Sequence, residues 1–250
     1  MKKRILFIFA IIVASFVQAQ VVKKITLTPG TLLNNLTPEE LATITDLTID
    51  GAIDARDFEV MRDKMLELQS IDLSAVSIDA YSGTDGTDLT ASQSYPVNEV
   101  PIYAFKNNKK IKTVILPSSA TSCGAGVFNS CDALTTVKMP EQVTILPNDF
   151  FSGCLLLTSV EMPKNLTEIG VYAFTGCSSL ENLSLPTTLK TIGGYAFEGC
   201  KFSTIMLPNS LESIGEGAFY VCKSMTSIVL PSSLKEVSNA LFNSCTALKS

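Results

Sequence analysis

The chain has 250 residues, of which 46% are hydrophobic and 17% charged, with a formal net charge of −5 and no histidine. The absence of histidine excludes Ser-His-Asp and Cys-His catalysis and histidine-based zinc sites. We find no Lys/Arg cluster beyond the N-terminal residues 2–4, and with the net negative charge this argues against nucleic acid or an anionic membrane as a partner.

The N-terminal residues 1–19 are typical of a secretory signal peptide. Three basic residues at 2–4 precede the predominantly apolar run Ile5–Phe16, and Val17 and Ala19 provide the small residues of a cleavage site. The run is shorter than the ~20 residues that a spanning helix needs. We therefore expect export, with cleavage leaving a net charge of −8 and no membrane span in the mature chain. The protein would be secreted, periplasmic or at the cell surface.

Residues 20–100 fit an N-terminal α/β cap with two short helices. The letters TPEE from Thr37 to Glu40 form a capping box, which predicts a helix to about Ile44. Asp54 predicts the start of a second helix. Its apolar positions share one face, and they are Phe58, Met61, Met65 and Leu68. Strand-like letters occur at Leu47–Ile49 and Ile71–Leu73. Because the end of a repeat array must cover an open core, we interpret this region as degenerate repeats acting as a cap.

An insertion of about 20 residues, roughly 79–98, interrupts the cap. Its letters YSGTDGTDLTASQSYP are rich in Gly, Ser, Thr and Asp, which predicts a solvated polar loop. Asp79, Asp85 and Asp88 raise the question of calcium. The D-x-D-x-D-G pattern with its distal Glu is absent, however, so we expect neither a metal site nor a cofactor.

Residues 101–250 repeat with a period of about 23. A phenylalanine recurs at Phe105, Phe128, Phe151, Phe174, Phe197, Phe219 and Phe242. Three residues after each lies one member of the row Asn108, Cys131, Cys154, Cys177, Cys200, Cys222 and Cys245. The single interval of 22 reflects one missing residue after Cys200. A fixed period of 20–29 residues with spaced leucines indicates leucine-rich repeats.

Each unit contains two short extended segments and a turn. Leu183–Leu185 (LSL) alternates as a half-buried strand must, and the following proline ends it. Leu189–Gly193 (LKTIG) is a second extended piece, in which Gly193 permits a bend. Tyr195–Cys200 (YAFEGC) is a helical or turn segment. Stacked units would share one core and form a continuous parallel sheet.

This unit resembles the BspA-like leucine-rich repeats of exported and surface-attached bacterial proteins. The resemblance implies a repeat solenoid with a parallel β-sheet on the concave face and short strands and helical turns on the convex face. It also implies adhesion, with host extracellular-matrix proteins among the ligands. The chain stops at Ser250, three residues short of the next strand, so we expect an incomplete C-terminal end and a longer protein.

The repeated cysteines do not have the close spacing of zinc ligands. Export would permit disulfides, but equivalent cysteines on neighbouring coils are held near the ~4.8 Å strand spacing and point the same way. We therefore favour a ladder of free, buried thiols that, like Asn108, donate to backbone carbonyls, with disulfides as the main alternative. Cys123 falls outside the row, at the usual glycine position, and is the candidate for an exposed thiol.

Residues that point away from the core form two rows that are candidates for binding a partner. These rows are Thr113, Thr136, Ser159, Asn182, Thr204 and Ser227, and Ile115, Lys138, Glu161, Ser184, Met206 and Val229. With no catalytic constellation, we predict a protein-interaction module and no enzyme. The alternatives are a structural spacer for a missing C-terminal domain and a glycan-binding accessory protein. A merely solvated sheet face also fits these rows.

Overall fold

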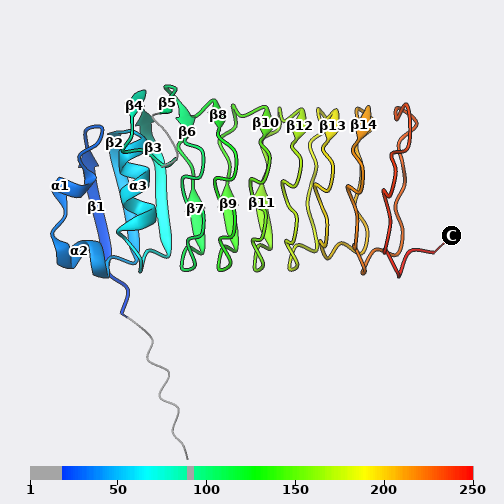
Figure 1. Cartoon of the computed structure of the whole chain (residues 1–250), viewed down its shortest axis with the longest axis horizontal. Helices are drawn as coiled ribbons and strands as arrows, with labels where there is room; N and C mark the ends of the chain where they lie inside the picture. The colour runs from blue at the N-terminus through cyan, green and yellow to red at the C-terminus, as the bar shows by residue number, and fades with distance from the viewer. Residues whose placement is uncertain (1–18, 89–92, 250) are drawn as a thin grey trace, which may run out of the picture.

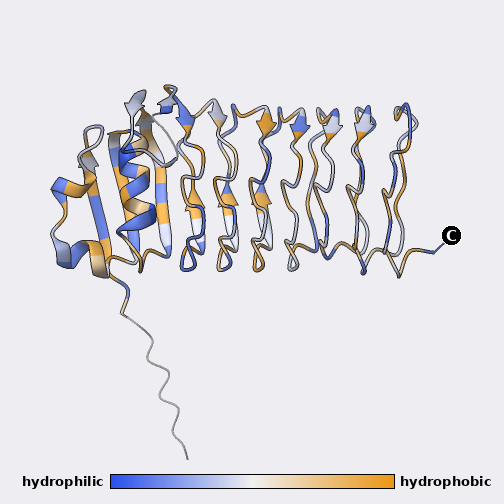
Figure 2. Cartoon of the chain, in the orientation of Figure 1, coloured by the Kyte–Doolittle hydropathy of each residue, from blue (hydrophilic) through white to orange (hydrophobic). Residues whose placement is uncertain are grey.

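The computed structural model describes residues 19–88 and 93–249 and shows a solenoid, whose coils stack in one row (Figure 1). The predicted leader lies outside the described residues except for Ala19. Three helices lie at the N-terminal end of this part of the chain: α1 (Leu32–Asn35), α2 (Pro38–Thr43) and α3 (Ala55–Asp63). Figure 2 shows apolar and polar residues alternating along the coils, with a largely hydrophilic outer face on α3.

Parallel strands from successive coils form the main sheet, in the order β1-β2-β3-β7-β9-β11. Its strands are β1 (Val22–Leu27), β2 (Asp46–Ile53), β3 (Ser70–Ile78), β7 (Thr113–Ile115), β9 (Thr136–Lys138) and β11 (Ser159–Glu161). A second parallel sheet follows another edge of the coils, with strands β10 (Ile145–Leu146), β12 (Glu168–Ile169), β13 (Thr191–Ile192) and β14 (Ser213–Ile214). Two small pairs complete the described strands: antiparallel β4 (Tyr81–Gly83) with β5 (Gln93–Tyr95), and parallel β6 (Glu99–Val100) with β8 (Ser122–Cys123).

Both helices predicted in the cap are confirmed. Thr37 caps α2 and Asp54 caps α3, each with a complete capping box. The helix α1 and the strand β1 were not predicted. Helix α3 ends at Asp63, so the buried Met65 and Leu68 lie in the turn after it rather than on its face.

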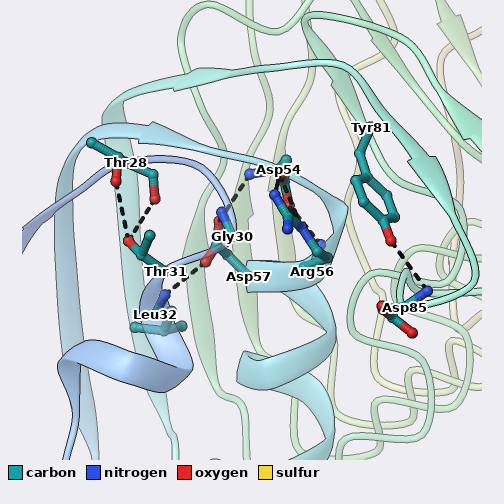
Figure 3. Close-up of polar contacts among 9 residues, drawn as sticks. All are labelled: Thr28, Gly30, Thr31, Leu32, Asp54, Arg56, Asp57, Tyr81 and Asp85. Carbon is teal, nitrogen blue, oxygen red and sulfur yellow. Dashed lines mark hydrogen bonds and ion pairs between the residues drawn. The ribbon is translucent and has the colours of Figure 1, made fainter.

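A buried carboxylate joins the start of α3 to the loop before α1 (Figure 3). Asp57 accepts backbone N–H groups from Gly30 at 2.7 Å, Leu32 at 2.9 Å and Asp54 at 3.0 Å. Burial raises the pKa of Asp57, although these three donors favour its ionised form. All three hydrogen bonds come from backbone amides of the cap, which indicates a structural role for Asp57.

The insertion is more ordered than its composition suggests, so the expectation of a simple solvated loop was wrong. Its ends pair as the antiparallel strands β4 and β5, where Tyr81 stacks on Tyr95 with ring centroids 6.1 Å apart. Thr87 is buried and donates its hydroxyl to the carbonyl of Ile102. The Arg56 guanidinium lies 4.7 Å from the Tyr81 ring centroid and ties the hairpin to α3.

The repeated phenylalanines form one continuous stack through the core. Successive rings from Phe105 to Phe242 are stacked with centroids 5.2–5.9 Å apart. Phe58 of α3 meets Phe105 edge-on at 5.8 Å and extends the stack into the cap. Aromatic pairs contribute about 0.5–1.5 kcal/mol beyond the burial of their surface, so this stack couples every coil to its neighbours.

The turn that carries each phenylalanine also bonds directly to the next coil. In one coil, the backbone amides of Tyr172, Phe174 and Gly176 donate to the next coil at 3.0, 2.7 and 2.7 Å. The first and third of these positions have a positive φ in every coil. Gly176 has φ 75°, but Tyr172 has φ 59° and Val221 has φ 58°. The bonds between coils therefore fix a left-handed conformation that is costly for residues other than glycine.

Replacing Val221 by glycine is expected to stabilise the protein by about 1 kcal/mol, because a β-branched residue is strained at φ 58°. Glycine occupies the equivalent positions 153, 176 and 199. The matched reverse change, Gly176→Val, should destabilise by about 1–2 kcal/mol. Urea unfolding followed by circular dichroism measures both, and a Val221→Gly variant less stable than wild type would contradict the assignment of strain.

Gly193 is needed for close packing rather than for a bend. Its φ is not positive, and a Cβ there would lie 2.6 Å from the backbone carbon of Gly170 in the preceding coil. Gly215 is similarly close to Gly193 and Gly194. Glycine at this position therefore lets successive coils approach one another.

The predicted continuous sheet is interrupted, which corrects the expectation for Leu183–Leu185. The main sheet ends at β11, and residues 181–185 make no backbone–backbone hydrogen bond to other described residues. Beyond them, a single parallel bridge joins Met206 to Val229. The interruption lies beside the coil that has lost one residue after Cys200. The backbone hydrogen bonds between the turns of successive coils continue across this interruption, and so does the second sheet. The coils therefore stay stacked.

Candidate interaction surface

The structure places all twelve candidate residues on the surface, each exposed or half-buried. In the first half of the repeats they lie on β7, β9 and β11, in register across the sheet. Thr113, Thr136 and Ser159 pair as one row, and Ile115, Lys138 and Glu161 as the other. This half is a flat sheet of small polar, charged and half-buried side chains.

The second half of the same face is hollowed into a groove. One hollow of about 420 Å³ lies between residues 182–185 and 204–206. A second, of about 230 Å³, lies between residues 204–207 and Val229. The two share Thr204, Ile205 and Met206, and we call them together the sheet-break groove. Of the candidate residues it gathers Asn182, Ser184, Thr204, Met206 and Val229, while Ser227 is exposed nearby.

Exposed apolar side chains and unpaired backbone meet in this groove. Met206 is 87% exposed and Val229 is 80% exposed, far more than any apolar residue of β7, β9 or β11. Facing Met206 is the segment 182–185, whose backbone groups have no backbone partner in the described chain.

The repeated cysteines lie in the core, away from this surface. Each Sγ donates to the carbonyl of a phenylalanine in the preceding coil at 3.0–3.3 Å. Burial raises the pKa of Cys131 and of Cys222 to about 12 and raises those of Cys154, Cys177 and Cys200 well above their ordinary value. Such thiols are poor nucleophiles at neutral pH. That these thiols stay free rather than form disulfides remains a prediction.

Asn108 and Cys123 both differ from expectation. Asn108 accepts hydrogen bonds through Oδ1 from the amides of Lys110 and Ile111, both at 2.9 Å, instead of donating to a carbonyl. Cys123 is buried, not exposed, because it pairs with Val100 in β8 and takes the core position that Ile169 and Ile192 take in later coils. The glycine position is the next residue, Gly124.

The comparisons with known proteins identify the repeat. The family model described as a BspA type leucine rich repeat region, with six copies, matches residues 74–178 and 144–250. The chain belongs to this family. No curated protein matches it.

Three solved structures of leucine-rich repeat or leucine-rich proteins are similar. A leucine-rich repeat protein from Bacteroides ovatus is 24% identical over 92% of this chain, with a TM-score of 0.63, and this chain spans 62% of its length. A T. pallidum leucine-rich repeat protein is 32% identical over 60% of this chain and 71% of its own, with a TM-score of 0.54. A leucine-rich cell surface protein from Faecalibacterium prausnitzii is 20% identical over 90% and 77%, with a TM-score of 0.50. These likenesses establish the leucine-rich repeat fold.

The sequence-based prediction did not include a cluster of tyrosines that lies outside the predicted face of the BspA-type repeats. Tyr172 stacks on Tyr195 with centroids 5.4 Å apart, and Tyr220 meets Tyr195 edge-on at 6.1 Å. Tyr172 is 41% exposed, and nearby Glu216 raises the pKa of Tyr195. The signal was available, because Tyr172 and Tyr195 hold the same place in successive repeats.

Leucine-rich repeat solenoids typically serve as interaction scaffolds rather than as enzymes. In this BspA-type chain, the described helices are all too short and too polar to cross a membrane. Residues 19–88 and 93–249 also contain no group of three His, Cys, Asp or Glu side chains placed to hold a metal ion.

Proposed function

We propose that this chain is an exported or cell-surface interaction module that binds a protein through the sheet-break groove. The observation that carries the proposal is the exposure of Met206 and Val229 beside backbone that lacks strand partners. Exposed apolar side chains that lie together in a hollow are typical of interaction sites, and methionine adapts well to a binding partner.

The chemistry of the groove favours an extended segment of the partner. A strand laid along residues 182–185 would satisfy their free backbone groups, and its alternate side chains would cover Met206 and Val229. The polar rows on β7, β9 and β11 would supply the rim of the contact. By family resemblance, adhesion to host extracellular-matrix proteins is the use that we propose for such binding. The similar structures include a cell surface protein, which supports this location.

A double variant, Met206→Asp with Val229→Asp, is expected to weaken binding to the partner at least about tenfold, because it places charge in the apolar centre of the contact. The measurement is saturation binding of the purified chain to surfaces coated with individual purified matrix proteins. Both residues are exposed, so the fold should be unaffected, which circular dichroism checks.

The matched control is Val22→Asp with Val237→Asp. These valines are 66% and 62% exposed and line neither hollow. The control should bind as wild type does. The proposal fails if both double variants bind equally well, or if the wild type binds none of the matrix proteins.

A further inference from the structure

A second groove, at the other end of the repeats, carries positive charge. It lies between the end of α3 and the turn 106–110, and comprises two hollows of about 430 and 360 Å³. The hollows share Arg62, Asp63, Lys106 and Asn107, and we call them the basic groove. It lies far from the sheet-break groove along the row of coils, because several coils separate residue 110 from residue 182 (Figure 1).

Four basic residues line this groove, so the expectation that no Lys/Arg cluster exists beyond the N-terminus was wrong. They are Arg62, Lys106, Lys109 and Lys110. Against them, the two hollows together have three acidic residues: Asp63, Glu67 and Asp88. The sequence alone shows four lysines between 106 and 112, but only the fold brings Arg62 to them.

The lysines remain available to a ligand. Lys109 pairs with Asp132 at 3.0 Å and Lys110 with Glu67 at 3.2 Å, but their side chains are 53% and 51% exposed. Exposed pairs of this kind contribute little and exchange readily for a stronger anion. Lys106 lies over the Tyr103 ring at 4.2 Å. The Arg62 side chain is 9% exposed and lies at the base of the groove. It pairs with Asp63 and donates to the carbonyl of Thr87.

One buried side chain in the same hollow, Asn108, has hydrogen-bond partners at its oxygen but none at its nitrogen among the described residues. Asn108 is 7% exposed, and its Oδ1 accepts both of its hydrogen bonds from backbone amides. Its Nδ2 donates to no described residue. Because no fully buried side-chain nitrogen or oxygen of the described chain lacks a partner, this nitrogen is not fully buried, and Asn108 lines the larger hollow. It is a fixed, neutral donor among flexible charged ones, which suits a ligand that carries both anions and hydroxyl groups.

We propose that the basic groove binds an anionic polysaccharide, with sulfate groups paired to Lys106, Lys109 and Lys110 and a sugar oxygen accepting from Asn108. Clusters of lysine in exported proteins suit such polyanions. Nucleic acid is the poorer match. Its recognition uses a long basic stripe and open aromatic faces, whereas this patch is confined to one junction between acidic residues, and Lys106 covers the Tyr103 ring.

The test measures binding of the full mature chain to immobilised heparin over a range of salt concentrations. The test variant combines Lys106→Gln, Lys109→Gln and Lys110→Gln. It should weaken heparin binding at least about tenfold. The slope of log affinity against log salt concentration should also become shallower by about three, because about three fewer ions are released on binding. Asn108→Cys, which installs the residue of the other repeats, should weaken binding severalfold with the salt dependence unchanged. The charge-matched control is Lys223→Gln, Lys235→Gln and Lys249→Gln, which should bind as wild type does. Circular dichroism shows that each variant is folded.

Desulfated heparin, inorganic sulfate and double-stranded DNA complete the experiment. The proposal expects weak binding of all three. It is overturned if the wild type does not bind heparin, if the control triple variant loses as much affinity as the test variant, or if DNA binds as tightly as heparin. The proposal is also overturned if inorganic sulfate binds as tightly as heparin when affinity is expressed per sulfate group, because the groove would then be a simple anion site. None of these outcomes depends on the sheet-break groove.

Discussion

Replacing Phe174 by alanine is expected to lower the free energy of unfolding by about 3–5 kcal/mol. The ring is fully buried and stacks on Phe151 at 5.2 Å and on Phe197 at 5.4 Å. Each coil of a solenoid contacts only its neighbours, so a cavity in the middle weakens the coupling on both sides. Urea unfolding followed by circular dichroism measures the change, and a second transition would show that the two halves have become uncoupled.

The matched control is Phe242→Ala, at the end of the same stack. Phe242 is only half-buried and has one stacked neighbour, Phe219 at 5.9 Å. Its loss should cost about 1–2 kcal/mol. Equal costs at the two positions would show that the stack does not couple the coils.

Stability is expected to fall steeply as the pH rises above about 9, because the buried thiols of the folded chain resist ionisation. Their ordinary pKa is near 9, and burial raises that of Cys131 and of Cys222 to about 12. Between these values the unfolded state has lost protons that the folded state keeps, so the free energy of unfolding decreases with pH. Each fully buried thiol contributes up to about 1.4 kcal/mol per pH unit. The stabilisation is complete below pH 9 and is lost toward pH 12.

Urea midpoints at pH 8, 9 and 10 measure this effect. The variant Cys154→Ala with Cys177→Ala should be less stable than wild type at pH 8 but should lose stability less steeply above pH 9. An unchanged slope would show that these thiols do not ionise on unfolding. Thiol titration of the exported protein under denaturing, non-reducing conditions should find seven free cysteines, and four or more blocked ones would replace the ladder with disulfides.

The periodic part of the fold could be predicted because it is determined by residues that are close together in the sequence. The regular spacing of the phenylalanines from Phe105 to Phe242 predicts the length of each coil. The capping residues Thr37 and Asp54 predict where two helices begin. Features set by contacts between coils could not be predicted. Val221 is left-handed because its amide bonds to Asn243 of the next coil at 2.9 Å, which overrides its own preference.

The candidate surface was predicted as two rows of residues, without the groove between them. Alternation along each strand placed Met206 and Val229 outward. It could not show that residues 181–185 lack strand partners, because that depends on how two coils of different length lie against each other. The basic groove escaped for a similar reason, since Arg62 and Lys106 are distant in sequence and meet only where α3 packs on the first repeat.

Protection of Met206 from oxidation tests the central proposal most directly. Its side chain is 87% exposed, whereas Met139 and Met225 are 3% and 0% exposed, so dilute peroxide should oxidise Met206 much faster in the free chain. If a matrix protein binds as proposed, mass spectrometry of the complex should show that oxidation of Met206 slows to the rate of the buried methionines. A stable complex in which Met206 is oxidised as fast as in the free chain would contradict binding through the sheet-break groove.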